Sequence, residues 1–202
     1  PKESSSFEIN QSPQIFNLKL HKTMNPTLKK NLDASVNDMG DGILNVEFHS
    51  SLQPRHNPID GSFVEMINYA LDLIEEDKFR AMILAHEGVN FSAGANLNLF
   101  LELCQNQQWD KLDFAVKTFQ NMTQRIRFSK GPVVAAPFQL TLGGGTEIIQ
   151  PAAHRVASAE TYMGFVEMGV GLIPGGGGNL RMILNAVEDD KGTTGSFQKI
   201  QK

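Results

Sequence analysis

Apolar and polar side chains alternate in some segments and recur at helical spacing in others. Residues 43–48 alternate with a period of two, which predicts a strand with one buried face. Residues 79–85 and 132–137 are short continuous apolar runs, typical of strands that are covered on both faces. A further short strand is expected at residues 155–158. These segments predict a sheet in the centre of the fold.

Between these predicted strands, apolar side chains recur at the spacing of an α-helix. Over residues 59–74 and 110–128, apolar side chains recur every three or four positions, so each segment is expected to form a helix with one buried face. Asp60 or Ser62 is expected to open the first helix, because Ser62 lies three residues before Glu65, as in a capping box. Strands that alternate with helices predict an α/β domain with a largely parallel sheet.

Both ends of the chain are polar. Residues 1–40 are interrupted by Ser, Asn, Gln and Pro, which predicts a linker or the edge of the ordered region, with order beginning at Ile43. Residues 188–202 are polar and loop-like, and predict a shortened C-terminal tail. The expected boundaries are therefore residues 1–40, 41–187 and 188–202.

Composition and charge argue against several classes of protein. The chain has 202 residues and a mass of 22.3 kDa, enough for one domain with a sizeable core. A net charge of −4 and a pI near 5.7 give no general attraction for nucleic acid or an anionic membrane. No apolar run approaches the roughly 18–20 residues of a membrane span, and the N-terminus lacks the apolar part of a signal peptide. Cys104 is the only cysteine, which excludes an internal disulfide, and we expect a cytoplasmic protein.

The stretch TLGGGTE, residues 141–147, places three glycines shortly before a glutamate. It fits neither nucleotide motif, because no glycine is followed by Lys and then Ser or Thr, and no G-x-G-x-x-G occurs. A G-x-S-x-G nucleophile elbow is also absent, since Asn90 stands at the first glycine position before Ser92. The five histidines lack metal-ligand spacing, so no metal is expected.

The same stretch belongs to a predicted strand, a tight turn at residues 138–143, and a helix that starts near Gly144 and includes residues 147–153. The first N–H groups of a helix have no intrahelical acceptor, and glycines let a substrate approach them closely. Such a helix start can hold a developing oxyanion, and Glu147, about one turn further on, could move a proton in the same space. On these residues alone, a packing turn followed by a Glu147 that favours the helix dipole is equally supported.

Four separated elements resemble the crotonase, or enoyl-CoA hydratase, superfamily. Residues 88–97, GVNFSAGANL, are similar to the family loop G-x-x-F-S/C-A-G-A/G-D-L. Residues 132–147, PVVAAPFQLTLGGGTE, are similar to its strand and turn P-V-I-A-A-x-x-G-x-A-x-G-G-G-x-E. Residues 162–167 and 169–178 match its F-G-x-x-E and G-x-x-P-G-x-G-G elements in order and spacing, so the resemblance covers about residues 43–186.

This resemblance implies an α/β crotonase (ClpP/crotonase-like) fold of repeated ββα units, here without the C-terminal helical region of full-length relatives. It implies an oxyanion hole made by the backbone N–H groups of Ala95 and Gly144, and two catalytic carboxylates, Glu147 and Glu167. Further positions that it implies for substrate and CoA binding are Ser92, Ala93, Gly94, Asn96, Gly143, Gly145, Pro174 and Gly175. The chain departs from the family at two positions, where Asn96 replaces the usual Asp and Gln139 replaces a usual glycine.

The implied reaction is hydration of a 2-enoyl-CoA to a 3-hydroxyacyl-CoA in fatty-acid β-oxidation, with coenzyme A as part of the substrate and no separate cofactor. The sequence looks closest to the hydratase part of bacterial multifunctional 3-hydroxyacyl-CoA dehydrogenases, so a dehydrogenase domain in a longer parent chain is an expected partner. The family also implies a homotrimer or a dimer of trimers. A non-catalytic acyl-CoA-binding module and an enoyl-CoA isomerase remain as alternatives, although isomerases usually replace one of the two carboxylates.

Overall fold

A computed structural model describes residues 18–188 of the chain, which form two sheets, six α-helices and one 3-10 helix. The strands are β1 (Thr27–Lys30), β2 (Ala34–Asp38), β3 (Ile43–Phe48), β4 (Ala81–Leu84), β5 (Val133–Ala135), β6 (Leu140–Leu142), β7 (His154–Arg155) and β8 (Tyr162–Gly164). The helices are α1 (Leu18–Met24), α2 (Gly61–Glu75), α3 (Leu97–Gln105), α4 (Trp109–Arg127), α5 (Gly144–Ile149) and α6 (Gly178–Glu188), with a 3-10 helix η1 (Glu167–Val170). Within the described residues, no helix is both long and apolar enough to cross a membrane.

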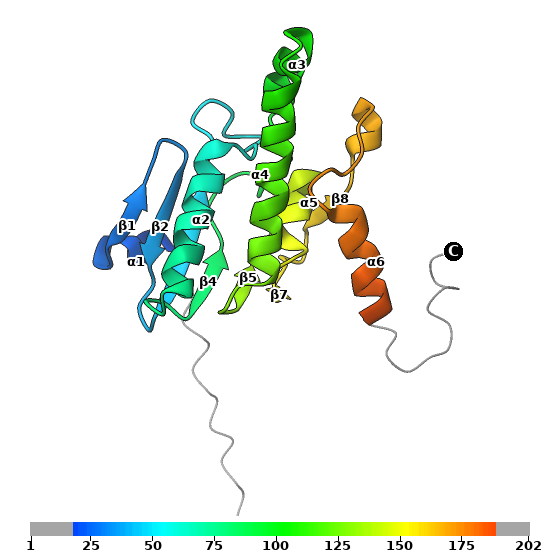
Figure 1. Ribbon diagram of the computed structural model, residues 1–202. Coiled ribbons are helices and arrows are strands. Elements are labelled where there is room, and N and C mark those ends of the chain that lie inside the picture. The colour runs from blue at the N-terminus through cyan, green and yellow to red at the C-terminus, as the bar shows by residue number, and fades with distance from the viewer. Residues whose placement is uncertain (1–17, 189–202) are drawn as a thin grey trace, which may run out of the picture.

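The larger sheet has the strand order β1-β2-β3-β4-β5-β7. Its first three strands pair antiparallel, and the pairs from β3 to β7 are parallel. Helices α2 and α4 lie side by side over one face of this sheet (Figure 1). Parallel strands connected through helices are the arrangement that the alternation of the two periods predicted.

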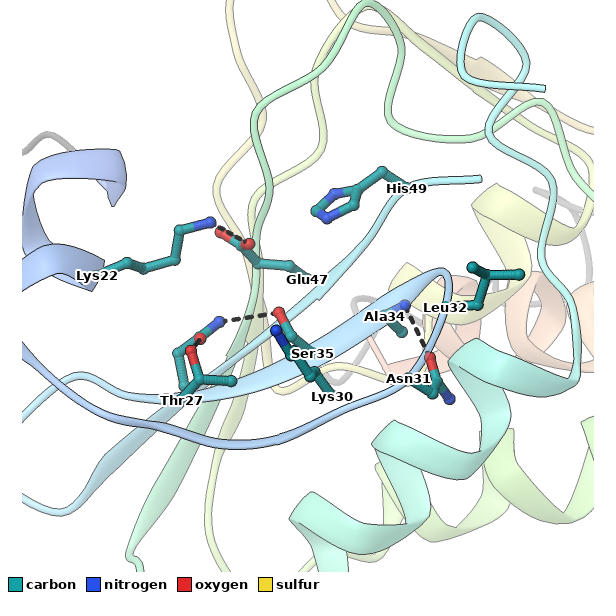
Figure 2. Close-up of a pocket in the computed structure, with 10 residues that line it drawn as sticks. Lys22, Thr27, Lys30, Asn31, Leu32, Ala34, Ser35, Glu47 and His49 are labelled. Atoms are coloured by element: carbon teal, nitrogen blue, oxygen red, sulfur yellow. Dashed lines mark hydrogen bonds and ion pairs between the residues drawn. The ribbon is translucent and has the colours of Figure 1, made fainter. Parts of the chain in front are cut away.

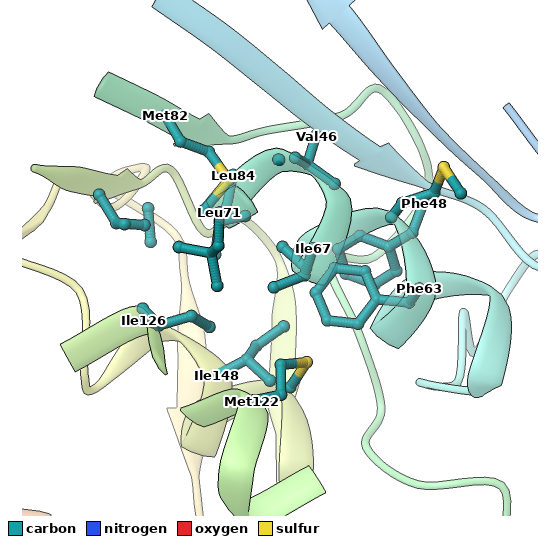
Figure 3. Packing of buried hydrophobic residues seen from close by; sticks show 14 of the residues in the cluster. Val46, Phe48, Phe63, Ile67, Leu71, Met82, Leu84, Met122, Ile126 and Ile148 are labelled. Atoms are coloured by element: carbon teal, nitrogen blue, oxygen red, sulfur yellow. The ribbon is translucent and has the colours of Figure 1, made fainter. Parts of the chain in front are cut away.

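The hydrophobic core lies between that face of the sheet and the two helices (Figure 3). Strand β3 is buried on both faces, with Asn45 and Glu47 each 1% exposed, so the expectation of a single buried face is wrong. The alternating residues Leu44, Val46 and Phe48 are each at most 2% exposed, which confirms the predicted strand. Their partners in the core are Phe63, Ile67 and Leu71 of α2, Met82 and Leu84 of β4, Met122 and Ile126 of α4, and Ile148 of α5. A shift of β3 by one residue would turn its apolar side chains away from this core, so burial fixes the register.

Helix α2 begins with a single side-chain cap. Asp60 has an extended backbone, and its Oδ1 accepts a hydrogen bond from the Phe63 N–H at 3.1 Å. Asp60 is therefore the N-cap, and the predicted capping box at Ser62 is wrong, because Ser62 is already the second helical residue. Glu65 instead accepts a hydrogen bond from Asn31 and pairs with Lys29 at 2.8 Å.

The prediction that residues 1–40 form a linker is wrong for residues 18–38. Strand β2 pairs antiparallel with β3 and extends the core, with Val36 fully buried. The strand was missed because its other face is polar, with Ser35 and Asn37 beside Val36, and because it has only five residues. Residues 1–17 and 189–202 lie outside the described part of the chain, so the expectations for both tails apply there untested.

The polar face of β2 and β3 forms a cleft under α1 (Figure 2). The Lys22 ammonium of α1 pairs at 2.6 Å with Glu47 of β3, whose side chain is 1% exposed. The Thr27 hydroxyl of β1 donates to Asn37 Oδ1 at 2.8 Å. The cleft has a volume of about 180 Å³, and none of its lining residues belongs to the site implied by the family motifs.

The segment 138–143 is more than the tight turn that was predicted. Within it, β6 pairs parallel with β8 in a second, two-stranded sheet. Three further elements differ from their predicted boundaries, and β7 shares only Arg155 with the strand predicted at 155–158. Helix α4 confirms the helix predicted at 110–128, α5 ends at Ile149 rather than at residue 153, and β7 contains only two residues.

Candidate active site

The loop after β4 is held on both sides by backbone hydrogen bonds. Towards β6, the Ser92 N–H donates to Leu140 O at 3.0 Å, and the Leu142 N–H donates back to Ser92 O at 2.8 Å. Towards the loop before α2, the Ala93 N–H donates to His56 O at 2.7 Å. We call residues 90–95 the oxyanion loop, because the family motif that they carry was predicted to supply an oxyanion donor.

The pairing ends at Ala95. The Gly94 carbonyl still accepts a hydrogen bond from the Ile59 N–H at 2.8 Å, but among the described residues the Ala95 N–H has no acceptor. The Gly144 N–H, at the first residue of α5, also has none within that part of the chain. The two groups are neighbours, since a Cβ added to Gly144 would lie 3.5 Å from the Ala95 nitrogen. Two backbone donors therefore lie side by side without acceptors.

Close approach of two loops explains the three consecutive glycines. Gly143 has φ 52° and ψ −122°, a backbone conformation that residues with a Cβ rarely adopt. A Cβ on Gly145 would lie 2.7 Å from Ser92 O, and one on Gly94 would lie 3.1 Å from the Gly144 nitrogen. The glycines bring the start of α5 against the oxyanion loop, which confirms the packing interpretation of TLGGGTE, while the donor interpretation stays a prediction.

Glu147 is a buried carboxylate with fixed orientation. Its side chain is on the first turn of α5, and the residue is 4% exposed. Its Oε1 accepts hydrogen bonds from the N–H groups of Gly176 at 2.8 Å and Gly178 at 2.9 Å. Burial raises the pKa of Glu147, the two N–H groups oppose this rise, and the nearby Glu167 carboxylate adds to it.

Glu167 lies beside Gly143, in the turn that precedes α5. It is the first residue of η1, and its Oε1 is 3.1 Å from the position of a Cβ on Gly143. Its Oε2 is buried and has no hydrogen-bond partner among the described residues. Buried polar atoms are nearly always paired, so this oxygen is available to a water molecule or to a ligand.

The structure brings most of the implied site residues together. Ser92, Gly94, Ala95, Gly143, Gly144, Gly145, Glu147 and Glu167 all adjoin the contact between the oxyanion loop and α5. The other four implied residues are Ala93, Asn96, Pro174 and Gly175. The Ala93 N–H is paired, Asn96 caps α3 by accepting from the Leu99 N–H at 3.4 Å, and Gly175 O accepts from Gln120 at 2.7 Å, next to the half-buried Pro174.

Gly176 and Gly178 were missed as site residues. Their N–H groups hold Glu147, and a Cβ on Gly176 would lie 2.1 Å from an edge atom of Phe119. The run of four glycines at 175–178 was the available signal, but glycine spacing alone does not say which N–H groups face a carboxylate. No cluster of three metal-ligating side chains occurs in residues 18–188.

Comparison with solved structures identifies the class of fold. An enoyl-CoA hydratase from Bacillus anthracis superimposes with a TM-score of 0.65 and 26% sequence identity, over 75% of this chain and 57% of that one. The class is an α/β protein of the crotonase fold, which confirms the predicted fold class. A family model described as enoyl-CoA hydratase/isomerase matches residues 53–193, and the chain belongs to this family.

Curated relatives are longer than this chain. It is 40% identical over 177 residues to a probable 3-hydroxyacyl-CoA dehydrogenase of Bacillus subtilis (strain 168), which covers 88% of the chain but 22% of that protein. It is 32% identical over 130 residues to a probable enoyl-CoA hydratase of the same strain, over 64% of the chain and 49% of that protein. The chain therefore spans only part of each of these relatives.

Proposed function

We propose that this chain hydrates 2-enoyl-CoA thioesters to 3-hydroxyacyl-CoA in fatty-acid β-oxidation. One observation carries the proposal: the N–H groups of Ala95 and Gly144 lack acceptors within the described residues, and the carboxylates Glu147 and Glu167 flank the same turn. A pair of donors beside a pair of carboxylates matches a reaction in which a carbonyl oxygen gains negative charge while protons move at adjacent carbons.

The steps balance without a separate cofactor. Glu147 takes a proton from water as the water oxygen bonds to C3 of the substrate. The electron pair of the C2–C3 double bond moves towards the thioester oxygen, and the resulting enolate accepts hydrogen bonds from the Ala95 and Gly144 N–H groups. Glu167 then donates a proton to C2. Transfer of a proton from Glu147 back to Glu167 restores both groups. The sum is then addition of one water molecule to the enoyl thioester, with coenzyme A carried by the substrate.

The environment of each carboxylate supports its assigned role. A carboxylate whose pKa is raised is a stronger base when ionised, and burial raises the pKa of Glu147. Oε1 of Glu147 is occupied by two N–H groups, so Oε2 is the oxygen assigned to the water. Glu167 has an unpaired buried Oε2, which is the oxygen assigned to carry the proton for C2.

Hydration of crotonyl-CoA, followed by the loss of enoyl thioester absorbance, tests this function. The unaltered chain should turn over, whereas Glu147→Gln and Glu167→Gln should each lower kcat by at least about 10²-fold, a usual contribution of a positioned acid or base. Both variants should still bind butyryl-CoA, a saturated analogue, in a calorimetric titration. Near-normal turnover in either variant contradicts the assignment of that residue.

The same assay separates the alternatives. Binding of butyryl-CoA by the unaltered chain without turnover of crotonyl-CoA supports a non-catalytic acyl-CoA-binding module. Conversion of a 3-enoyl-CoA to a 2-enoyl-CoA without hydration supports an isomerase.

We also propose that the chain corresponds to the hydratase part of a multifunctional 3-hydroxyacyl-CoA dehydrogenase. The 40% identity to the Bacillus subtilis relative, over 88% of this chain, supports this context. The single cysteine, Cys104, supports a reducing compartment such as the cytoplasm.

Assembly into a homotrimer or a dimer of trimers is part of the same proposal. Supporting it, β8, η1, α6 and the segments between them expose many large apolar side chains, which we call the C-terminal apolar residues. They are Tyr162, Met163, Val166, Met168, Val170, Leu172, Ile173, Leu180, Met182, Ile183, Leu184 and Val187. Exposed apolar side chains in such number are typical of surfaces that bind another protein surface.

A further inference from the structure

One carbonyl of the oxyanion loop receives two side-chain contacts. The Asn57 Nδ2 donates to Phe91 O at 2.9 Å, and the His86 Nε2 lies 2.9 Å from the same oxygen. Because a carbonyl oxygen can only accept, the contact with His86 requires a proton on Nε2. Phe91 O is therefore held by two donors, one for each of its lone pairs.

His86 is held in a single state. It is 7% exposed, and burial lowers its pKa to about 4, so its ring is neutral near pH 7 with one N–H group, at Nε2. Three aromatic rings enclose it. Those of Phe48, Phe91 and Phe138 lie 4.7, 5.3 and 5.1 Å away between centroids. The Nδ1 atom is buried and has no partner among the described residues, so the ring is oriented by Nε2 and by packing.

Asn57 connects the same carbonyl to the end of β3. Its Oδ1 accepts from the Ser50 N–H at 2.8 Å, and its Nδ2 also donates to Phe48 O at 3.1 Å. The residue is 2% exposed and has φ 45°, a left-handed conformation that asparagine tolerates better than most residues. The Asn57 side chain thus links the loop before α2 to the end of β3 and to Phe91 of the oxyanion loop.

The position of Phe91 affects the donor four residues later. Between them the loop is paired at Ser92, Ala93 and Gly94, and the next N–H, that of Ala95, has no acceptor among the described residues. A segment anchored at Phe91 O and at Gly94 O has little freedom to move its next N–H. Misplacing a group at a reacting centre by about 1 Å can cost ~10²-fold in rate.

We infer that His86 and Asn57 are positioning residues that hold the oxyanion loop through Phe91 O, and so aim the Ala95 N–H at the thioester oxygen. The inference rests on the proposed function and extends it to two side chains outside the reacting groups. Neither residue touches the substrate in this scheme, because His86 Nε2 and the Asn57 amide are already paired with backbone groups.

The first variant removes one donor and keeps the ring. His86→Phe retains aromatic packing against Phe48, Phe91 and Phe138 but cannot donate to Phe91 O. We expect kcat for crotonyl-CoA hydration to fall about tenfold to hundredfold. KM should change less than about twofold, because the donor acts mainly on the developing oxyanion. His86→Gln, whose amide nitrogen can occupy the place of Nε2, should restore kcat to within a few-fold of the unaltered chain.

Two further variants separate an effect on the oxyanion loop from a general loss of folding stability. Asn57→Asp removes the other donor to Phe91 O while retaining an acceptor for the Ser50 N–H, and should also lower kcat. Phe63→Leu is the matched packing control, because its ring lies 4.4 Å from Phe48 and is not bonded to the oxyanion loop. It should lower Tm and leave kcat unchanged.

A readout without turnover completes the experiment. The NMR order parameter of the Ala95 amide should be near 0.85, a rigid backbone, in the unaltered chain and below about 0.6 in His86→Phe. An unchanged order parameter and unchanged kcat in His86→Phe and Asn57→Asp overturn the inference. If the unaltered chain fails to hydrate crotonyl-CoA, the proposed function fails, and the order parameter still decides whether the two residues position the loop.

Discussion

Glu147 is almost completely buried, and this burial raises the pKa of its carboxyl group. The N–H groups of Gly176 and Gly178 stabilise its ionised form, but they do not offset the loss of hydration and the nearby Glu167. The folded chain therefore favours the protonated form of Glu147 more than the unfolded chain does.

Replacing Glu147 by Gln should consequently not destabilise the fold near pH 7. A raised pKa contributes stability that is complete below the unfolded value of about pH 4.3, and that contribution is lost as the pH rises through the folded value. The amide resembles the protonated acid at every pH. Glu147→Gln should thus have a Tm at pH 7 equal to or above that of the unaltered chain, and the difference should shrink towards pH 4. Thermal melts at several pH values check this, and a lower Tm for the variant at pH 7 only would contradict it.

Both departures from the family motifs are accommodated locally. Gln139 has φ 47°, a conformation that glycine adopts without strain, and its carbonyl accepts from the Tyr162 N–H at 2.8 Å. Asn96 accepts from the Leu99 N–H as an aspartate cap would. The turn and the helix start therefore form despite the substitutions, while Asn96 leaves one negative charge fewer beside Ala95.

Strand β2 shows that the N-terminal segment is part of the core. Val36→Ala removes two buried methyl groups and should lower the free energy of unfolding by about 2 kcal/mol. Leu32→Ala, in the connection between β1 and β2, is the matched control, because Leu32 is 77% exposed. It should change the free energy of unfolding by less than about 0.5 kcal/mol. Urea denaturation measures both, and equal effects would mean that β2 does not contribute to the core.

The loop before α6 depends on the absence of side chains. A Cβ on Gly176 would lie 2.1 Å from Phe119 and 2.8 Å from Glu147 Oε2, whereas one on Gly175 would meet nothing closer than 3.8 Å. Gly176→Ala should lower the free energy of unfolding by about 1–3 kcal/mol, as overpacking does. Gly175→Ala should cost less than about 1 kcal/mol. Comparable losses in the two variants, measured by thermal and urea unfolding, would argue that the loop simply moves aside.

Exposed apolar side chains are concentrated in the C-terminal part of the described fold, from β8 to α6. Core side chains come mainly from β2 to β5 and from α2 and α4, whereas η1, α6 and the segment between them expose Met168, Leu180 and Ile173 at 79%, 53% and 71%. Figure 1 shows α6 set apart from the larger sheet. The second half of the fold therefore leaves much of its apolar surface uncovered within residues 18–188.

Self-association should follow from this surface if the proposed assembly is right. Sedimentation velocity at tens of micromolar protein should detect oligomers, and Ile173→Lys should shift the distribution towards the monomer. Leu52→Lys is the control, because Leu52 is also exposed, at 87%, but lies in the loop before α2. A monomer at every concentration, or equal effects of the two substitutions, would count against the C-terminal apolar residues as the contact.

Sequence patterns predicted the strands and helices whose structure depends mainly on residues close to them in the chain. The period of two at 43–48 and the helical spacing at 110–128 predicted β3 and α4, because the apolar side chains that pack on the core repeat with the period of the strand or helix that carries them. The four family motifs predicted the crotonase fold and named the two glutamates. Strands β1 and β2 were not predictable in this way, since each gains its stability from pairing with a neighbouring strand.

Only tertiary structure decided how the motifs meet. Ala95 and Gly144 are 49 positions apart in the chain, and their N–H groups become neighbours because Gly94, Gly143 and Gly145 let two loops approach closely. The donors that hold Glu147 come from the loop before α6 and from its first residue, and those that hold Phe91 come from the loops before α2 and after β4. Hydrogen bonds and contacts between distant segments depend on the distance and direction between atoms in space. A short stretch of sequence does not determine these distances and directions.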